Sequence, residues 1–149
     1  MELKIGDKAP DFKSKNENGN EITLSGFMGK KLALYFYPKD DTSGCTAQAC
    51  NLRDSLPSLN AAGYQVVGVS VDDEKSHLKF ITKYGLNFPL IADTDHQLVE
   101  AFGVWKEKSM YGKKYMGTVR TTFIIDEKGF ITNIIDKVKT AEHADQILH

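Results

Sequence analysis

The stretch LALYFYPKDDTSGCTAQAC, residues 32–50, places a short apolar run directly before a polar segment that contains two cysteines. Leu32–Tyr37 is apolar and aromatic throughout, which is typical of a buried β-strand. Residues Cys45–Asp54 have the pattern of a helix, and either Thr42 or Ser43 can serve as its N-terminal cap. The sequence therefore predicts a strand, a loop and a helix, with the loop at the sheet edge where open α/β sheets place ligand sites.

Further strand and helix signals follow along the chain. Strand-like runs are found at Tyr64–Val71, Pro89–Ala92, Thr121–Ile125 and Phe130–Ile135. Helical spacing is found over Glu74–Tyr84, with Asp73 as N-cap and Gly85 as its left-handed stop, and over Asp95–Phe102. This order predicts an α/β fold with a mixed central sheet flanked by helices, in a single domain of residues 1–149.

Composition and charge exclude several classes of function. A formal net charge of −1 over 149 residues provides no basic face for nucleic acid. No stretch approaches the roughly 18 apolar residues of a membrane span, and residues 1–10 lack the apolar run of a signal peptide. We therefore expect a cytoplasmic protein without nucleic-acid or membrane partners, in a compartment that keeps thiols reduced.

Two cysteines five positions apart in such a compartment indicate redox catalysis or metal binding rather than a permanent disulfide. Cys45 falls in the first turn of the predicted helix, where unsatisfied N–H groups and the helix dipole favour a thiolate. A thiolate that attacks a peroxide becomes a sulfenic acid, which a second thiol converts to a disulfide. The histidines lack ligand spacing, so no metal or other cofactor is expected at His77, His96, His143 and His149.

Pro38, Thr42 and Cys45 reproduce the pattern PxxxTxxC, and the surrounding PKDDTSGCTAQAC resembles the peroxiredoxins, in particular the subfamily called bacterioferritin comigratory protein or peroxiredoxin Q. The likeness continues in GDKAPDF (6–12), VVGVSVDD (66–73), FPLIAD (88–93), FGVW (102–105) and YMGTVRTTFIID (115–126). The resemblance implies a thioredoxin-like fold with the additional elements of peroxiredoxins. It also implies reduction of hydrogen peroxide and organic hydroperoxides in antioxidant defence, with electrons from thioredoxin or a similar dithiol. A monomer is expected, with a weak dimer as the alternative.

The same resemblance implies roles for five residues. Cys45 would be the peroxidatic nucleophile, and Cys50 would resolve its sulfenic acid as an intramolecular disulfide. Thr42 would hydrogen-bond the thiolate and the peroxide, and Pro38 would shield the site from water. Arg120 would be the arginine that stabilises the site, and its planar guanidinium supplies a donor geometry that lysine cannot copy.

The sequence departs from the subfamily pattern at two positions beside Cys45. Ser43 stands where proline usually precedes Gly-Cys, and it should leave the loop looser. Gln48 stands where glutamate is usual, which removes a negative charge near the thiolate but keeps a hydrogen-bonding side chain. Neither change removes a group that the chemistry requires, so both concern the rate and the local stability.

The spacing of the cysteines predicts motion. On one ideal helix, the Cα atoms of Cys45 and Cys50 are about 8.6 Å apart and point roughly 140° away from each other. A disulfide requires Cα atoms within about 7 Å. We therefore expect residues 45–51 to unwind before the disulfide forms. Pro57 is predicted to end or offset the helix, which would leave it short and make unwinding less costly.

Other readings remain open at this point. Either cysteine could be a small buried hydrophobe, and Arg120 could form an ordinary surface ion pair. A disulfide oxidoreductase is disfavoured, because it normally needs two residues between its cysteines and four lie between these. A redox sensor without turnover stays possible. The basic segment 106–114 most simply forms a solvated face, with guidance of an acidic partner as the alternative. The aromatics Trp105, Tyr111 and Tyr115 are expected to pack in the core or lie at the surface, with lining of the site mouth as the alternative.

Overall fold

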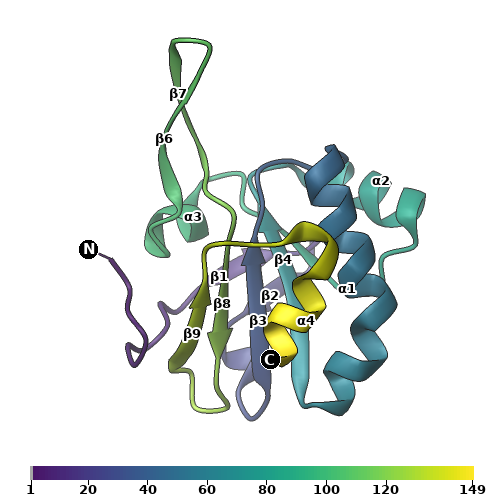
Figure 1. Ribbon diagram of the computed structural model, residues 1–149. Coiled ribbons are helices and arrows are strands. Elements are labelled where there is room, and N and C mark those ends of the chain that lie inside the picture. Colours follow the sequence, from purple (N-terminus) through teal and green to yellow (C-terminus); the bar gives the residue numbers. More distant parts are fainter. Residues whose placement is uncertain (1) are drawn as a thin grey trace.

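The apolar runs of the sequence pair into one five-stranded sheet at the centre of the structure (Figure 1). The computed structural model describes residues 2–149. From edge to edge the sheet contains β5 (Leu90–Ala92), β4 (Tyr64–Ser70), β3 (Lys31–Phe36), β8 (Thr121–Ile125) and β9 (Ile131–Ile135). Strands β3, β4 and β5 are parallel, whereas β8 pairs antiparallel with both β3 and β9. The mixed central sheet predicted from the sequence is thus confirmed.

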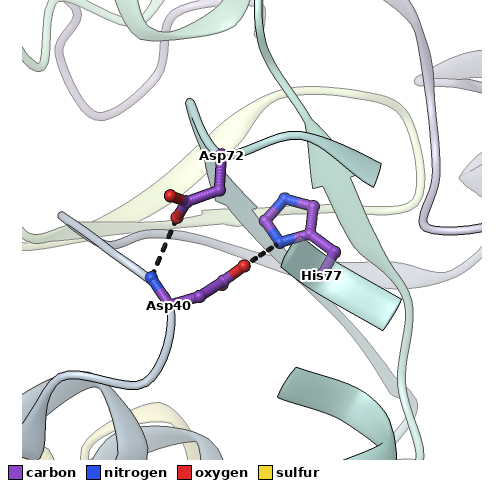
Figure 2. A group of neighbouring side chains, drawn as sticks. All are labelled: Asp40, Asp72 and His77. Atoms are coloured by element: carbon purple, nitrogen blue, oxygen red, sulfur yellow. Dashed lines mark hydrogen bonds and ion pairs between the residues drawn. The ribbon is translucent and has the colours of Figure 1, made fainter. Parts of the chain in front are cut away.

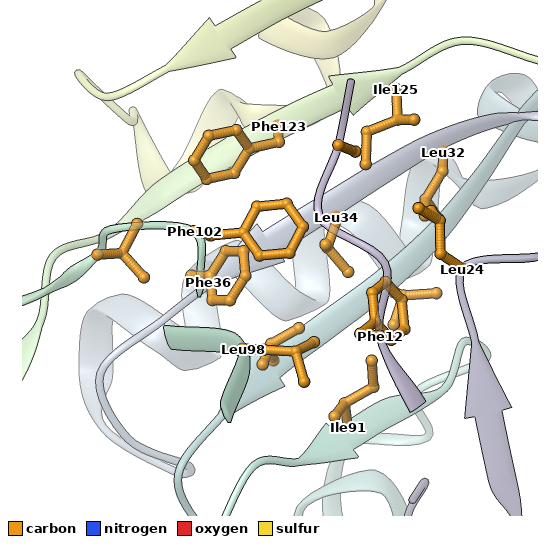
Figure 3. Close-up of a cluster of buried hydrophobic side chains, with 14 of the residues drawn as sticks. Phe12, Leu24, Leu32, Leu34, Phe36, Ile91, Leu98, Phe102, Phe123 and Ile125 are labelled. Carbon is orange, nitrogen blue, oxygen red and sulfur yellow. The ribbon is translucent and has the colours of Figure 1, made fainter. Parts of the chain in front are cut away.

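Alternate side chains of β3 enter two different cores, because successive residues of a strand point to opposite faces of the sheet. Leu34 and Phe36 belong to one cluster, and Ala33 and Tyr35 belong to the other. Figure 3 shows the first cluster, in which Phe36 meets Phe123 of β8 edge to face. Strand β3 is therefore buried on both faces, which explains why its sequence is continuously apolar rather than alternating.

The helices that cover the sheet are α1 (Ser43–Ala61), α2 (Glu74–Tyr84), α3 (Gln97–Ala101) and α4 (His143–Leu148). Side chains of α1, α2 and α4 belong to one core cluster, whereas α3 contributes to the cluster on the opposite face. The predicted ends of α2 are confirmed, since the Asp73 side chain accepts the Ser76 N–H and Gly85 has a φ of 62°. Helix α3 begins two residues later than the predicted Asp95.

Helix α1 runs without interruption through Pro57, so the prediction that this proline ends or offsets the helix is wrong. Proline has no N–H to donate to the carbonyl one turn earlier, which belongs to Arg53. In the structure, Nδ2 of Asn87 donates to that carbonyl oxygen over 3.2 Å. A side chain from the segment after α2 therefore replaces the missing helical hydrogen bond.

Two hairpins and the C-terminal helix were not predicted. One hairpin consists of β1 (Lys13–Lys15) and β2 (Glu21–Thr23), and the other of β6 (Trp105–Met110) and β7 (Lys113–Thr118). In Figure 1 the β6–β7 hairpin projects from the body of the molecule, and Tyr111 at its tip is 99% exposed. Because most of its side chains face solvent, this hairpin lacks the apolar alternation by which strands are recognised.

Short 3₁₀ turns, η1 (Ser25–Phe27) and η2 (Thr140–Glu142), lie before β3 and before α4. The second turn and α4 both pack against α1. Within residues 2–149, no helix combines the length and the apolar character needed to cross a membrane.

Candidate active site

The carboxyl end of β3 and the amino end of β8 lie side by side, since Phe36 pairs with Thr121. The residues after β3 form the β3–α1 loop (Pro38–Thr42), which leads directly into α1. Arg120 immediately precedes β8 at the same edge of the sheet. The register of two antiparallel strands therefore brings this arginine to the start of α1, although 75 positions separate it from Cys45.

Cys45 and Arg120 are in direct contact. Cys45 lies in the first turn of α1 and is 2% exposed. Nη2 of Arg120 donates to the Cys45 sulfur at 3.3 Å, and Nη1 donates to Oε1 of Gln48 at 2.7 Å. Gly44 leaves room for this approach, because a Cβ atom at that position would lie 3.3 Å from Nη2. The guanidinium thus bridges the sulfur and an amide one helical turn later.

Thr42 and Pro38 border the same site. Thr42 occupies the N-cap position of α1, but its hydroxyl donates to the Lys39 carbonyl at 2.9 Å and makes no capping bond. The side-chain cap predicted for Thr42 or Ser43 is therefore wrong, because the threonine hydroxyl turns toward the loop. A hydroxyl has a single proton to donate, so Thr42 does not donate to the Cys45 sulfur in this conformation. Pro38 is half-buried at the start of the loop.

Two further ionisable groups respond to the charges of the site. Tyr35 is buried, and burial, followed by the charges of Cys45 and Asp40, raises its pKa well above the ordinary value. Tyr35 therefore remains a neutral phenol. Lys108 of β6 is half-buried, and burial together with the charge of Arg120 lowers its pKa, with a smaller opposing effect from Cys45. The β6–β7 hairpin thus adds a second cation near the sulfur.

Cys50 lies on the same continuous helix as Cys45, and both are free thiols. Cys50 is half-buried, whereas Cys45 is buried. Ideal helix geometry places their Cα atoms about 8.6 Å apart, beyond the roughly 7 Å that a disulfide allows. The folded α1 therefore keeps the two thiols from joining.

The β3–α1 loop is tied to α2 by two successive aspartates. Asp40 is buried, and its carboxylate faces Nδ1 of His77 at 2.7 Å. Asp41 is exposed and accepts from Nζ of Lys83 at 2.8 Å and from the Tyr84 hydroxyl at 2.5 Å. These two hydrogen bonds lower the pKa of the Asp41 carboxyl. Both aspartates thus hold the β3–α1 loop against α2.

Asp40, Asp72 and His77 bring ligand-type atoms within 4.8 Å of one another (Figure 2). These atoms already have partners. Nδ1 of His77 lies 2.7 Å from Oδ2 of Asp40, and Oδ2 of Asp72 accepts the Asp40 backbone N–H at 2.9 Å. We interpret the group as a hydrogen-bonded ion-pair network and not as a metal centre.

Sequence reasoning missed two features of this site. Gln48 was noted only as a departure from a pattern, although its position three residues after Cys45 places both on one helix face. That spacing is a signal that could have identified it as the partner of Arg120. The pairing of Asp40 with His77 joins residues 37 positions apart, and no local pattern marks it. Trp105 packs on the ring of His96, with centroids 4.4 Å apart.

Comparisons with known proteins point to one family. Residues 5–134 match the model of the AhpC/TSA family. The chain is 46% identical over 147 residues to Peroxiredoxin Bcp of Escherichia coli K12, covering 99% of this chain and 94% of that protein. It is 45% identical over 148 residues to Peroxiredoxin Bcp of Bacillus subtilis, with the same coverage of both chains.

Solved structures give the same result. A mutant of PrxQ from Xylella fastidiosa superposes with a TM-score of 0.93 at 36% identity, covering 99% of this chain and 94% of that one. A bacterioferritin comigratory protein from Xanthomonas campestris, described for its alkyl peroxide reduction activity, superposes with a TM-score of 0.86 at 42% identity and covers 92% of this chain and 87% of its own. The chain therefore belongs to the AhpC/TSA family and, within it, to the Bcp/PrxQ peroxiredoxins, which are thiol peroxidases of thioredoxin-like fold.

Proposed function

We propose that Cys45 is the nucleophile with which this peroxidase attacks hydrogen peroxide and organic hydroperoxides. The observation that carries this assignment is the hydrogen bond from Arg120 to the Cys45 sulfur, at 3.3 Å, in the first turn of α1. A cation and the N-terminal end of a helix both stabilise a thiolate, which is the reactive form of cysteine. Cys50 lies outside this contact and is the proposed resolving cysteine.

In the first step, the Cys45 thiolate attacks one peroxide oxygen and the O–O bond breaks. Cys45 becomes a sulfenic acid, and the other oxygen takes a proton and leaves as water or an alcohol. Donors that face the leaving oxygen lower the barrier, because negative charge moves onto it. Arg120 supplies such donors, and Gln48 holds the guanidinium in place. Pro38 and Thr42 are proposed to complete the pocket, with Thr42 turning from the Lys39 carbonyl toward the peroxide.

In the second step, the Cys50 thiol attacks the Cys45 sulfenic acid, a disulfide forms and water leaves. The separation of the two residues on folded α1 requires residues 45–51 to unwind first. The helix remains long, so its length does not ease this step. The unwinding is favoured instead by the small buried residues of this segment, Cys45 and Ala49, which lose little apolar contact on release.

In the third step, a dithiol reductant returns both cysteines to the thiol form by exchange through a mixed disulfide. Thioredoxin is the proposed reductant, since the unwound segment would present the disulfide to a partner. The proposed location is the cytoplasm, where such reductants are maintained. A monomer suffices for this cycle, because both cysteines belong to one chain.

A stoichiometric reaction tests the assignment. The reduced protein is mixed with one equivalent of hydrogen peroxide, and the thiols and the protein mass are followed. We expect rapid loss of both thiols and a mass decrease of two hydrogens. Cys45→Ser should abolish the reaction, whereas Cys50→Ser should accumulate a sulfenic acid at Cys45. Oxidation no faster than that of a free thiol would contradict the role of Cys45. A parent protein that oxidises to a Cys45–Cys45 disulfide between two chains, with Cys50 still a free thiol, would contradict the role of Cys50.

A further inference from the structure

A buried polar network, distinct from the Arg120 contact with the Cys45 sulfur, joins Asp40 of the β3–α1 loop to Ser76 and His77 of α2. At its centre, the Asp40 carboxylate accepts from the Tyr37 hydroxyl at 2.5 Å and from the Ser76 hydroxyl at 2.8 Å. Asp40 is 7% exposed. Figure 2 shows its carboxylate directed at the His77 ring, while its backbone N–H meets Asp72. Both carboxylate oxygens and the backbone N–H of Asp40 therefore have partners inside the protein.

His77 is held between two acceptors. Its Nδ1 lies 2.7 Å from Oδ2 of Asp40, and its Nε2 lies 2.8 Å from the carbonyl oxygen of Ile91 in β5. A carboxylate and a carbonyl can only accept, so both ring nitrogens must carry protons for both bonds to exist. Burial lowers the pKa of His77, but the Asp40 carboxylate and the Ile91 carbonyl raise it above the ordinary 6.5.

We propose that Asp40 and His77 are positioning residues for peroxide reduction: protonated His77 fixes Asp40, and Asp40 fixes the β3–α1 loop that presents Pro38 and Thr42 beside Cys45. This inference rests on the proposed role of Cys45. Asp40 lies two residues after Pro38 and two before Thr42, so it holds the loop at its middle. The second anchor, Asp41, is exposed to solvent and contributes less, because exposed ion pairs are weak.

The network makes the β3–α1 loop sensitive to pH, and the loop is expected to be held less firmly as pH rises. Because the folded pKa of His77 is raised, its stabilising effect is complete below the ordinary value and is lost as pH rises through the folded value. The groups that face the ring are the Asp40 carboxylate, the more distant Asp72, the Tyr37 hydroxyl and the Ile91 carbonyl. Loss of one proton leaves one acceptor without a donor and removes the countercharge of Asp40. The loop should loosen, and the reaction of Cys45 should slow on the alkaline side.

Two amide variants separate the bonds of His77, in a Cys50→Ser background that isolates the first step. The amide of His77→Asn can reach the position of Nδ1 and donate to Asp40, whereas that of His77→Gln can reach the position of Nε2 and donate to Ile91. The second-order rate of Cys45 oxidation by hydrogen peroxide is measured from pH 6 to pH 10. We expect His77→Gln to lose about tenfold at neutral pH, the effect of one charge-assisted hydrogen bond. The rate should fall less in His77→Asn. In both variants the rate should lack the decline at alkaline pH that is expected of the parent protein.

Rates equal to those of the parent at every pH in both variants would overturn the proposal and leave the role of Cys45 intact. A parent protein whose Cys45 does not react with peroxide would overturn both proposals together. Ring ¹⁵N NMR of the unmutated protein provides a test that does not depend on variant folding. We expect both nitrogens of His77 to carry protons at neutral pH, and a neutral ring would contradict the proposal.

Discussion

The two halves of α1 are held in different ways. The first half, residues 43–51, contains both cysteines and is held mainly by polar contacts. Arg120 donates to Cys45 and to Gln48, and Oδ1 of Asn51 accepts the Ala144 N–H of α4 at 2.8 Å. Its buried apolar residues are small, so their release costs little hydrophobic free energy.

The second half, residues 52–61, is anchored by the core. Leu52 and Leu59 are fully buried. Nη1 of Arg53 donates to the Tyr84 carbonyl at the end of α2 over 2.6 Å. The contrast indicates that one helix joins a segment that can be released to a segment that cannot. The boundary of the proposed unwinding is expected between residues 51 and 52.

The largest expected effect is on the rate of the Cys45 reaction, and it should differ between substitutions of the two arginines of the chain. Arg120→Ala should slow the reaction of Cys45 with peroxide by about 10²–10³-fold, the cost typical of losing a donor that stabilises developing charge. Its matched control is Arg53→Ala, which removes a guanidinium from the second half. That variant should react at the parent rate but unfold at a lower urea concentration. Single-turnover oxidation and urea unfolding of both variants provide the check, and equal rate losses in the two would contradict the division of α1.

A smaller effect concerns the contact between α1 and α4. Asn51→Ala removes the acceptor of the Ala144 N–H, which should cost about 1 kcal/mol and favour the unwound first half. Disulfide formation after oxidation of Cys45 should then accelerate about fivefold. Asn60→Ala, in the exposed last turn, is the control and should leave this rate unchanged. A slower or unchanged rate in Asn51→Ala would show that α4 does not restrain the first half.

Pro57 and Asn87 allow a double-mutant cycle in the second half. Asn87→Ala should cost about 0.5–1 kcal/mol in the free energy of unfolding, because the Arg53 carbonyl loses its donor. In a Pro57→Ala background the helix supplies its own N–H to that carbonyl, so the same substitution should cost less. The coupling energy from the cycle measures how much the Asn87 side chain compensates for the helical hydrogen bond that Pro57 cannot make. Additive effects would mean that Asn87 does not compensate for the proline.

The smallest effect is a pH dependence that arises at α4. Burial, with a contribution from Arg120, lowers the pKa of His143, whose Nε2 lies 2.7 Å from the Thr122 hydroxyl. A histidine with a depressed folded pKa costs stability as pH falls below 6.5, because the unfolded chain takes up the proton first. The free energy of unfolding should decline with acid in the parent protein and decline less in His143→Gln. If the free energy of unfolding fell equally steeply with acid in both proteins, His143 would not be the source of the pH dependence.

Much of the fold followed from local patterns. The buried strands and the capped α2 were predictable, because apolar runs, an aspartate cap and a left-handed glycine act within a few residues. The β6–β7 hairpin was missed because its side chains face solvent. The prediction that Pro57 ends or offsets the helix was wrong because the donor that compensates for the proline, Asn87, lies 30 positions away.

The site was predictable to a similar degree. The cysteines and Arg120 followed from a motif and a family resemblance. Other contacts join segments that only the folded chain brings together. They are the contact of Gln48 with Arg120, the pairing of Asp40 with His77 and the link from Asn51 to α4. The direction of the Thr42 hydroxyl could not be predicted either, since it depends on the competing Lys39 carbonyl.

Hydrogen exchange of the reduced and disulfide forms tests the central claim most directly. Backbone amides of α1 are followed by mass spectrometry in the protein with both thiols free and after stoichiometric oxidation. Amides of residues 45–51 should lose protection when the disulfide forms, while amides of residues 54–61 should keep it. Equal protection of both halves in both forms would contradict the account, because the two cysteines would then have joined without unwinding the helix.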